Sequence, residues 1–191
     1  MEYLQGHFTK KIGLDERIWM VFVLLAGINV QMGRSQNTSP LADTYGLPNY
    51  FPLKNESFIK LSSDYGYRMH PLNQKLKKHR GIDLVAKTGS SVYASASGSV
   101  VETGFEAGYG NYVLLLHECR TKTLYGHLLS YSVKDGEFVK KGQVIGKVGA
   151  TGKVTGPHLH YEIWIKNKRV DPLLFWRKIM GTTNRGKTES K

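Results

Sequence analysis

The chain has 191 residues and 40% are hydrophobic, which allows one domain with a core and excludes a wholly disordered polymer. Lys and Arg number 27 against 15 for Asp and Glu, and the net charge of +12 favours an anionic partner such as nucleic acid, a membrane face or an acidic cell envelope. The single cysteine, Cys119, excludes an intrachain disulfide scaffold and a multi-cysteine zinc finger.

An apolar run near the start predicts export. Residues 18–30 read IWMVFVLLAGINV, carry no charge and follow three basic residues at 10, 11 and 17. The run is shorter than the roughly 20 residues that cross a bilayer, and its length suits the core of a signal peptide. Because no small-x-small cleavage site follows, an uncleaved anchor and a buried segment of the main domain stay open. We expect residues 1–33 to be a signal peptide or signal anchor, with the rest of the chain periplasmic or extracellular.

Polar segments flank the main body. Residues 34–52 contain Ser, Asn, Pro and Gly without clear periodicity, which is typical of a linker. Residues 181–191 read GTTNRGKTESK and predict a polar tail. The remaining residues, 53–180, form one expected domain.

The main body reads as a series of short β-strands. Apolar runs rich in Val, Tyr and Ile alternate with Gly, Asp and Asn, and no long window keeps a helical period. The clearest expected strands lie at 99–104, 112–118, 123–128, 143–149 and 158–165, and residues 172–180 allow one short helix. We therefore predict a mainly β fold, an antiparallel sheet with short hairpins, a groove for the site and few helical turns.

Two histidines stand two positions apart in the segment GPHLHYE. Alternate residues of a strand point to the same face, so His158 and His160 project together while Leu159 and Tyr161 turn toward the core. An H-x-H pair on its own also occurs as surface histidines without a ligand.

A second polar pair, His79 and Asp83, lies in the segment HRGIDL. Gly81 and the following Ile-Asp-Leu-Val favour an extended chain, in which residues 79, 81 and 83 share one face and Gly81 leaves room between the polar side chains. A carboxylate beside histidines suits a divalent metal ion. A simple His–Asp hydrogen bond explains the pair equally well when it is taken alone.

A third histidine, His127, ends an apolar run beside a glycine. The three groups together meet the needs of catalytic zinc, which takes three ligands from His and Asp or Glu and keeps water in the fourth position. His79, Asp83 and one histidine of the H-x-H pair supply such a set. The other two histidines can then serve as general base and as transition-state stabiliser.

These motifs, in this order, resemble the lysostaphin-type zinc endopeptidases that degrade peptidoglycan. That family shows an H-x-x-x-D pair, a histidine after a strand and an H-x-H near the end of the domain. The resemblance runs from about Ser62 to Pro172 and includes the text around the motifs: GYRMHP at 66–71, GYGNYV at 108–113 and GATG at 149–152.

The resemblance implies that His79, Asp83 and His160 bind one Zn²⁺ per chain and that His127 and His158, the catalytic pair, flank the attacking water. It implies a zinc endopeptidase that hydrolyses the peptide cross-links of bacterial peptidoglycan by metal-activated water. The expected partners are peptidoglycan peptides, with the N-terminal segment as a membrane tether if it is retained. Which of the catalytic pair is the base stays open.

Glu162 shares the face of the H-x-H pair. It can orient His160 as a hydrogen-bond partner, and it can equally be a solvated charge between strands.

Rival interpretations come from two glycine-rich patterns. The hairpins at 98–104 and 142–149 also occur in lipoyl-type carrier domains, but no lysine stands at the required tight turn. The stretch GATGKV at 149–154 is similar to a phosphate loop, but Val154 replaces the needed Ser or Thr and no helix is expected next, so we expect no nucleic-acid partner. A catalytically inert wall-binding or activator relative remains the alternative, although no ligand position is substituted.

Overall fold

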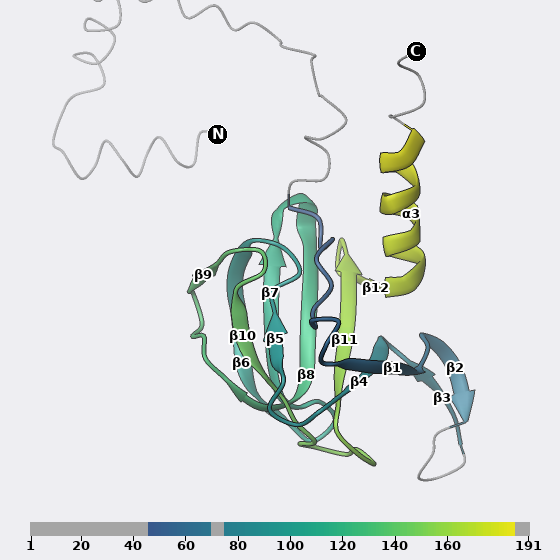
Figure 1. The fold of residues 1–191 in the computed structure, drawn as a ribbon, viewed down its shortest axis with the longest axis vertical. Coiled ribbons are helices and arrows are strands. Elements are labelled where there is room, and N and C mark those ends of the chain that lie inside the picture. The colour runs from purple at the N-terminus through teal and green to yellow at the C-terminus, as the bar shows by residue number, and fades with distance from the viewer. Residues whose placement is uncertain (1–45, 70–74, 186–191) are drawn as a thin grey trace, which may run out of the picture. The chain divides into compact units, whose positions relative to one another are not determined.

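Short apolar runs divided by turns build most of the described structure (Figure 1). The computed structural model describes residues 46–69 and 75–185. Its strands are β1 (Phe58–Ser63), β2 (Gly66–Met69), β3 (Leu76–His79), β4 (Ile82–Ala86), β5 (Ser91–Tyr93), β6 (Gly98–Glu106), β7 (Gly110–His117), β8 (Thr121–Tyr131), β9 (Phe138–Val139), β10 (Val144–Val148), β11 (His158–Ile165) and β12 (Lys168–Val170). Its helical elements are the 3₁₀ turn η2 (Glu118–Arg120) and the helix α3 (Pro172–Arg185).

These elements confirm the predicted mainly β domain, and the five clearest expected strands appear as β6, β7, β8, β10 and β11. The predicted leader at 1–33 lies outside the described residues, so a signal or tether function stays a prediction. The described ranges contain no helix long and apolar enough to cross a membrane.

The strands pair antiparallel, as expected. In the described part of the chain, ten strands form one sheet in the order β1-β4-β11-β8-β7-β6-β9, with β10 against β5 and β8, and β12 against β11. β2 and β3 form a separate hairpin beside β1 and β4 (Figure 1). Because β11 lies between β4 and β8, residues at its start can meet side chains from both neighbours.

One face of β11 is part of the hydrophobic core. Leu159, Tyr161 and Ile163 are fully buried, and the strand's period of two turns the alternate residues to the other face. Burying each such large apolar side chain contributes about 1.5–3 kcal/mol. A register slip by one residue would expose all three, so this burial fixes the face that carries His158 and His160.

The C-terminal helix covers the core. Trp176 of α3 stacks on Tyr161 with ring centroids 5.3 Å apart, and its indole N–H donates to the carbonyl of Pro48 at 2.8 Å. Asp171 caps the helix, because its Oδ1 accepts the N–H of Leu173 at 2.8 Å. α3 extends to residue 185, longer than the predicted helix of 172–180, and keeps the domain helical past the expected boundary.

The segment before β1 also contacts the core. Phe51 lies 5.5 Å from Trp176 by ring centroids, and the Tyr50 N–H donates to the Ser95 carbonyl at 2.9 Å. Residues 46–52 were expected to end the linker, because their composition shows no periodicity. The structure places them against the domain through single apolar anchors, which leave no periodic trace in the sequence.

Candidate active site

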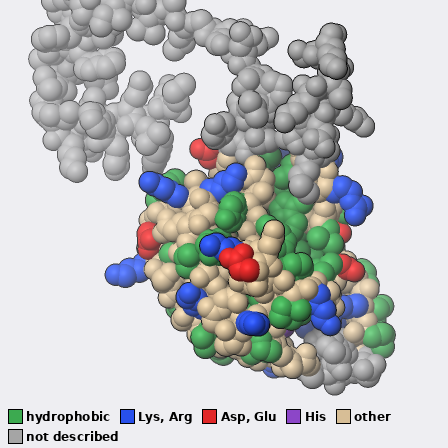
Figure 2. Space-filling view, in the orientation of Figure 1, with side chains coloured by type: hydrophobic (Ala, Val, Ile, Leu, Met, Phe, Trp, Pro, Cys, Tyr) green, Lys and Arg blue, Asp and Glu red, His purple; other side chains and the backbone are tan. Residues whose placement is uncertain are grey.

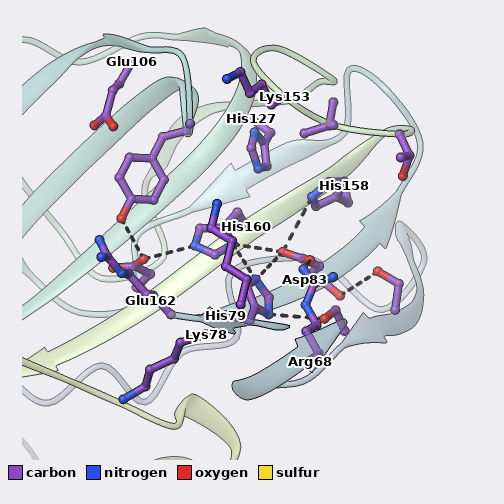
Figure 3. Close-up of a pocket in the computed structure, with 18 residues that line it drawn as sticks. Arg68, Lys78, His79, Asp83, Glu106, His127, Lys153, His158, His160 and Glu162 are labelled. Atoms are coloured by element: carbon purple, nitrogen blue, oxygen red, sulfur yellow. Dashed lines mark hydrogen bonds and ion pairs between the residues drawn. The ribbon is translucent and has the colours of Figure 1, made fainter. Parts of the chain in front are cut away.

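Strand register brings the predicted ligand residues together. His160 of β11 lies opposite Asp83 of β4, and His79 at the end of β3 reaches the same place (Figure 3). Asp83 Oδ1 lies 2.9 Å from His160 Nδ1 and 3.1 Å from His79 Nε2. The two histidine nitrogens are 3.1 Å apart.

This donor set fits a zinc ion. Bonds of about 2.0–2.1 Å in a tetrahedron separate neighbouring ligand atoms by about 3.3 Å. The three pairs of donor atoms here lie close to that separation, and the residues supply two imidazole nitrogens and one carboxylate oxygen. The set leaves one side open toward the cleft, as a catalytic rather than a structural site requires.

Each of the three residues has a further partner that orients it. His79 Nδ1 donates to the Asp64 carbonyl at 2.7 Å, which leaves Nε2 free for an ion. The second Asp83 oxygen accepts a bond from the Arg68 guanidinium at 3.3 Å. His160 Nε2 lies 3.2 Å from Glu162 Oε1 and can donate to it, so Nδ1 is the nitrogen left for an ion.

Charge is concentrated in this group. Burial alone would raise the pKa of Asp83, but hydrogen bonds to His160 and His79 hold that pKa well below its usual range. Burial alone would lower the pKa of His160, but the carboxylates of Asp83 and Glu162 raise it to about 9. Without an ion, His160 therefore carries a second proton at pH 7, in the position where a divalent cation would bind.

His127 and His158 line the opposite wall of the site. Their rings are 4.7 Å apart by centroids, and the His127 ring is 5.7 Å from that of His160. His127 Nδ1 donates to the Thr151 carbonyl at 2.9 Å, and His158 Nδ1 donates to the Gly156 carbonyl at 2.8 Å. His127 Nε2 is thus left for water or substrate, and His158 Nε2 lies 3.6 Å from Asp83 Oδ1.

The backbone of His127 differs from the expectation that it ends a strand. It lies inside β8 with φ of 60°, a left-handed conformation that is uncommon outside glycine and clusters at functional sites. Its N–H donates to the Tyr109 carbonyl at 2.6 Å, which holds this conformation. Burial, with the neighbouring histidines His158 and His160, lowers the pKa of His127 to about 4, so its ring is neutral at pH 7.

A cleft of about 510 Å³ opens above these residues. Its walls carry five basic side chains: Arg68, Lys77, Lys78, Arg80 and Lys153. Of its acidic residues, Asp83 and Glu162 are buried and paired within the site, which leaves Glu106 exposed at the rim. Basic side chains are also spread widely over the face shown in Figure 2, with separate patches of acidic ones between them. The cleft therefore favours substrates with free carboxylates.

Gly81 has a different function from the one expected. Its missing side chain leaves room for β11 rather than between His79 and Asp83. A Cβ at this position would lie 2.3 Å from the Tyr161 carbonyl oxygen and 3.0 Å from the His160 ring.

Sequence reasoning missed the residues that hold Glu162. Arg169 Nε and Trp164 Nε1 donate to Glu162 Oε2 at 2.8 and 2.6 Å, and the Tyr109 hydroxyl donates to Oε1 at 3.0 Å. The sequence signal that could have found Arg169 is Asn167, because Asn favours the left-handed positions of a two-residue hairpin turn. Lys166 and Asn167 have φ of 47° and 63°, as in a two-residue type I′ hairpin turn, which pairs Trp164 with Arg169.

The remaining histidines lie apart from this group or outside the described residues. His117 is buried at the end of β7, where its ring bonds to the Ser97 carbonyl and the Thr123 hydroxyl. His70 falls outside the described residues. Cys119 is exposed in η2, the turn between β7 and β8.

The fold and the donor set together define the class: a β-sheet domain with a two-histidine, one-aspartate metal site of the metallopeptidase kind. The chain belongs to peptidase family M23, whose profile matches residues 77–172. This confirms the resemblance found in the motifs.

Three known proteins illustrate the similarity. The peptidoglycan DD-endopeptidase ShyC of Vibrio cholerae is 42% identical over 116 residues, 60% of this chain and 27% of its own length. A zinc-containing peptidase from Vibrio cholerae matches with a TM-score of 0.61 and 35% identity over 66% of this chain and 39% of that one. The catalytic domain of lysostaphin from Staphylococcus simulans matches with a TM-score of 0.57 and 34% identity over 64% of this chain and 94% of that domain. The chain spans less than a third of the curated relative's length.

Proposed function

We propose that this chain is a zinc-dependent endopeptidase that hydrolyses peptide cross-links of bacterial peptidoglycan. The observation that carries the proposal is the group of three donor atoms within about 3 Å of one another in a cleft, with two further histidines facing them. A relative named a peptidoglycan DD-endopeptidase supports the substrate, and a similar structure described as zinc-containing supports the metal.

In this proposal His79 Nε2, Asp83 Oδ1 and His160 Nδ1 hold the ion. Zinc bound there would polarise a peptide carbonyl and lower the pKa of a water toward about 7. The protein contributes the fixed geometry: β3, β4 and β11 place the three donors before any substrate arrives, which leaves little to reorganise during reaction.

His127 and His158 move protons in this proposal. His127 is neutral at pH 7 and has its Nε2 unprotonated, because Nδ1 carries the proton that the Thr151 carbonyl accepts. We assign it as the base that accepts a proton from the attacking water. His158 Nε2 lies 3.6 Å from Asp83 Oδ1, next to the donor group, where it can bond to the developing oxyanion or the leaving amine. A base of this kind contributes roughly 10²- to 10⁴-fold in rate.

The basic cleft supports an acidic peptide substrate, and peptidoglycan stems carry free carboxylates. A cell-wall substrate also requires the site to act outside the cytoplasm, so we propose that the apolar run at 18–30 serves export.

The test combines metal content with hydrolysis of purified peptidoglycan by the full-length chain. We expect about one zinc per chain and release of peptide fragments. Removing the metal with a chelator should abolish release, and adding zinc back should restore it. Substrates with D,D cross-links and with glycine bridges should be assayed in parallel, since the named relatives include a DD-endopeptidase and lysostaphin.

The outcomes separate the two candidate functions. Wild-type protein that holds no zinc and releases nothing from any wall type ends the enzyme proposal. Zinc retained without turnover on every cross-link type tested favours the inert wall-binding or activator relative.

A further inference from the structure

Glu162 is the most deeply buried charged residue around the site. It is fully buried, yet four donors converge on it: His160 and Trp164 from its own strand, Arg169 from β12, and Tyr109 from the turn between β6 and β7. Figure 3 shows the contact between Glu162 and His160. A buried carboxylate costs folding free energy unless it is fully paired, and apolar residues often replace such groups without loss of stability. Stability alone therefore gives no reason for a charge here.

The contacts around Glu162 form a closed ring. Arg169 Nε donates to Glu162 Oε2 at 2.8 Å, and the other arm of Arg169 donates to the Tyr109 hydroxyl at 3.2 Å. That hydroxyl in turn donates to Glu162 Oε1 at 3.0 Å. The ring ties β12, the turn between β6 and β7, and β11 to one side chain.

Only a carboxylate suits this position. Both oxygens of Glu162 face donors: Trp164 and Arg169 at Oε2, and Tyr109 and His160 at Oε1. An ionised carboxylate accepts at both oxygens, whereas a glutamine of the same size must turn its NH₂ toward one pair of donors. If that NH₂ faced His160, the proton would move to Nδ1, the nitrogen proposed to bind zinc.

We propose that Glu162, Arg169 and Tyr109 form a positioning ring that holds His160 with its proton on Nε2 and so sets the zinc affinity of the site. This inference rests on the proposed zinc site. The ring acts on only one of the three ligands. Nδ1 of His79 instead lies 2.7 Å from the Asp64 backbone carbonyl and 3.3 Å from the Ser63 hydroxyl, and neither partner is a carboxylate.

The ring also explains why β12 follows β11 so closely. The hairpin turn at Lys166 and Asn167 pairs Trp164 with Arg169, and the Arg169 guanidinium lies over the Trp164 ring at 4.2 Å. Stacking fixes the guanidinium plane, so its Nε points at Glu162 and its other arm at Tyr109.

The experiment measures zinc affinity by chelator competition on the full-length chain. Glu162→Gln should weaken zinc binding about 10- to 100-fold, the usual effect of losing a partner of a ligand histidine. Arg169→Leu should weaken it less, and Tyr109→Phe least. Long-range ¹H–¹⁵N spectra of the zinc-loaded wild type should place the His160 proton on Nε2, and Glu162→Gln should lose that signal.

A second Glu–Tyr pair on the same sheet supplies the control. Glu102 of β6 and Tyr112 of β7 hydrogen-bond to each other, and neither lines the cleft, although the Tyr112 ring lies 6.1 Å from that of Tyr109. Glu102→Gln and Tyr112→Phe should leave zinc affinity unchanged.

Each result decides the inference. A wild type that binds zinc, with Glu162→Gln within twofold of it, overturns the positioning ring and leaves the proposed function intact. A wild type that binds no zinc overturns both. If Glu162→Gln does not fold, Tyr109→Phe keeps the test open, because it deletes only one hydroxyl at the cleft wall. An affinity equal to wild type in both foldable ring variants, Tyr109→Phe and Arg169→Leu, likewise overturns it.

Discussion

The cleft has a ligand wall, made of His79, Asp83 and His160, and a catalytic wall, made of His127 and His158. The two walls hold their histidines in different ways. On the ligand wall, His160 lies between two carboxylates, and its pKa is raised to about 9. On the catalytic wall, Nδ1 of His127 and Nδ1 of His158 each donate to a backbone carbonyl, and His158 Nε2 also lies 3.6 Å from the Asp83 carboxylate. The pKa of His127, which has the carbonyl as its hydrogen-bond partner, is lowered to about 4. Carboxylates attract a cation, whereas a neutral carbonyl fixes a ring without charging it.

This difference matches what each wall must do. A ligand wall has to concentrate negative charge where an ion will bind, and the ion then replaces the proton on His160 Nδ1, while Nε2 keeps its proton. A catalytic wall needs a ring that is oriented but unprotonated at neutral pH, so that it can accept a proton. One residue type therefore serves two purposes, and the partner of the second ring nitrogen decides which.

The strongest test of this comparison substitutes one histidine from each wall. His160→Ala should lose both zinc and activity, because it removes a ligand. His127→Ala should keep zinc and lose activity by roughly 10²- to 10⁴-fold, because it removes only the base. Metal content and peptidoglycan hydrolysis, measured on the same preparations, check both outcomes. Equal zinc loss in the two variants would show that the walls are not separate in function.

The next test removes the space that brings the ligand wall together. Gly81→Ala places a Cβ 2.3 Å from the Tyr161 carbonyl oxygen, so β4 and β11 must move apart. We expect a loss of about 1–3 kcal/mol or more in unfolding free energy, together with weaker zinc binding. Denaturant unfolding and chelator competition measure the two effects.

Gly156→Ala is the matched control for that substitution. Gly156 lies just before the H-x-H pair and has no positive φ, and a Cβ added there would meet no atom within 4 Å. The variant should stay within about 0.5 kcal/mol of wild type, as ordinary surface substitutions do. A similar loss in both variants would mean that the strand spacing at Gly81 is not what holds the ligands.

The metal-ligand residues could be predicted from the sequence, whereas most of the residues that orient them could not. Alternation along a strand predicted that His158 and His160 share a face, because that pattern is local. Arg68 and Tyr109 come from other parts of the chain and meet the site only through sheet pairing, so no local pattern identified them. The left-handed backbone of His127 could not be predicted either, since the hydrogen bond that holds it runs from the His127 N–H to the Tyr109 carbonyl, in the turn between β6 and β7.

The orientation of His127 can be disturbed without substituting a histidine, through Thr151. The Thr151 hydroxyl donates to the Leu128 carbonyl at 2.8 Å and accepts the Asn111 N–H at 2.9 Å, and this fixes the carbonyl that His127 uses. Thr151→Val should lower kcat about tenfold, the equivalent of one or two lost hydrogen bonds, with KM and zinc affinity near wild type. Thr151→Ser keeps the hydroxyl and should restore kcat. A fall in zinc affinity instead would place Thr151 on the ligand side of the comparison.

His117 extends the comparison to a histidine outside the site. It bonds to the Ser97 carbonyl and the Thr123 hydroxyl without a carboxylate, and burial lowers its pKa from 6.5. The unfolded chain then binds a proton at a higher pH than the folded one, so stability is complete above pH 6.5 and falls as pH drops toward the lowered pKa. The loss is at most about 1.4 kcal/mol per pH unit. Unfolding free energies of the metal-free protein between pH 7.5 and 5 should show this slope, and His117→Gln, which cannot titrate, should reduce it. An unchanged slope would mean that carbonyl-bound histidines in this fold do not resist protonation, which would weaken the same argument for His127.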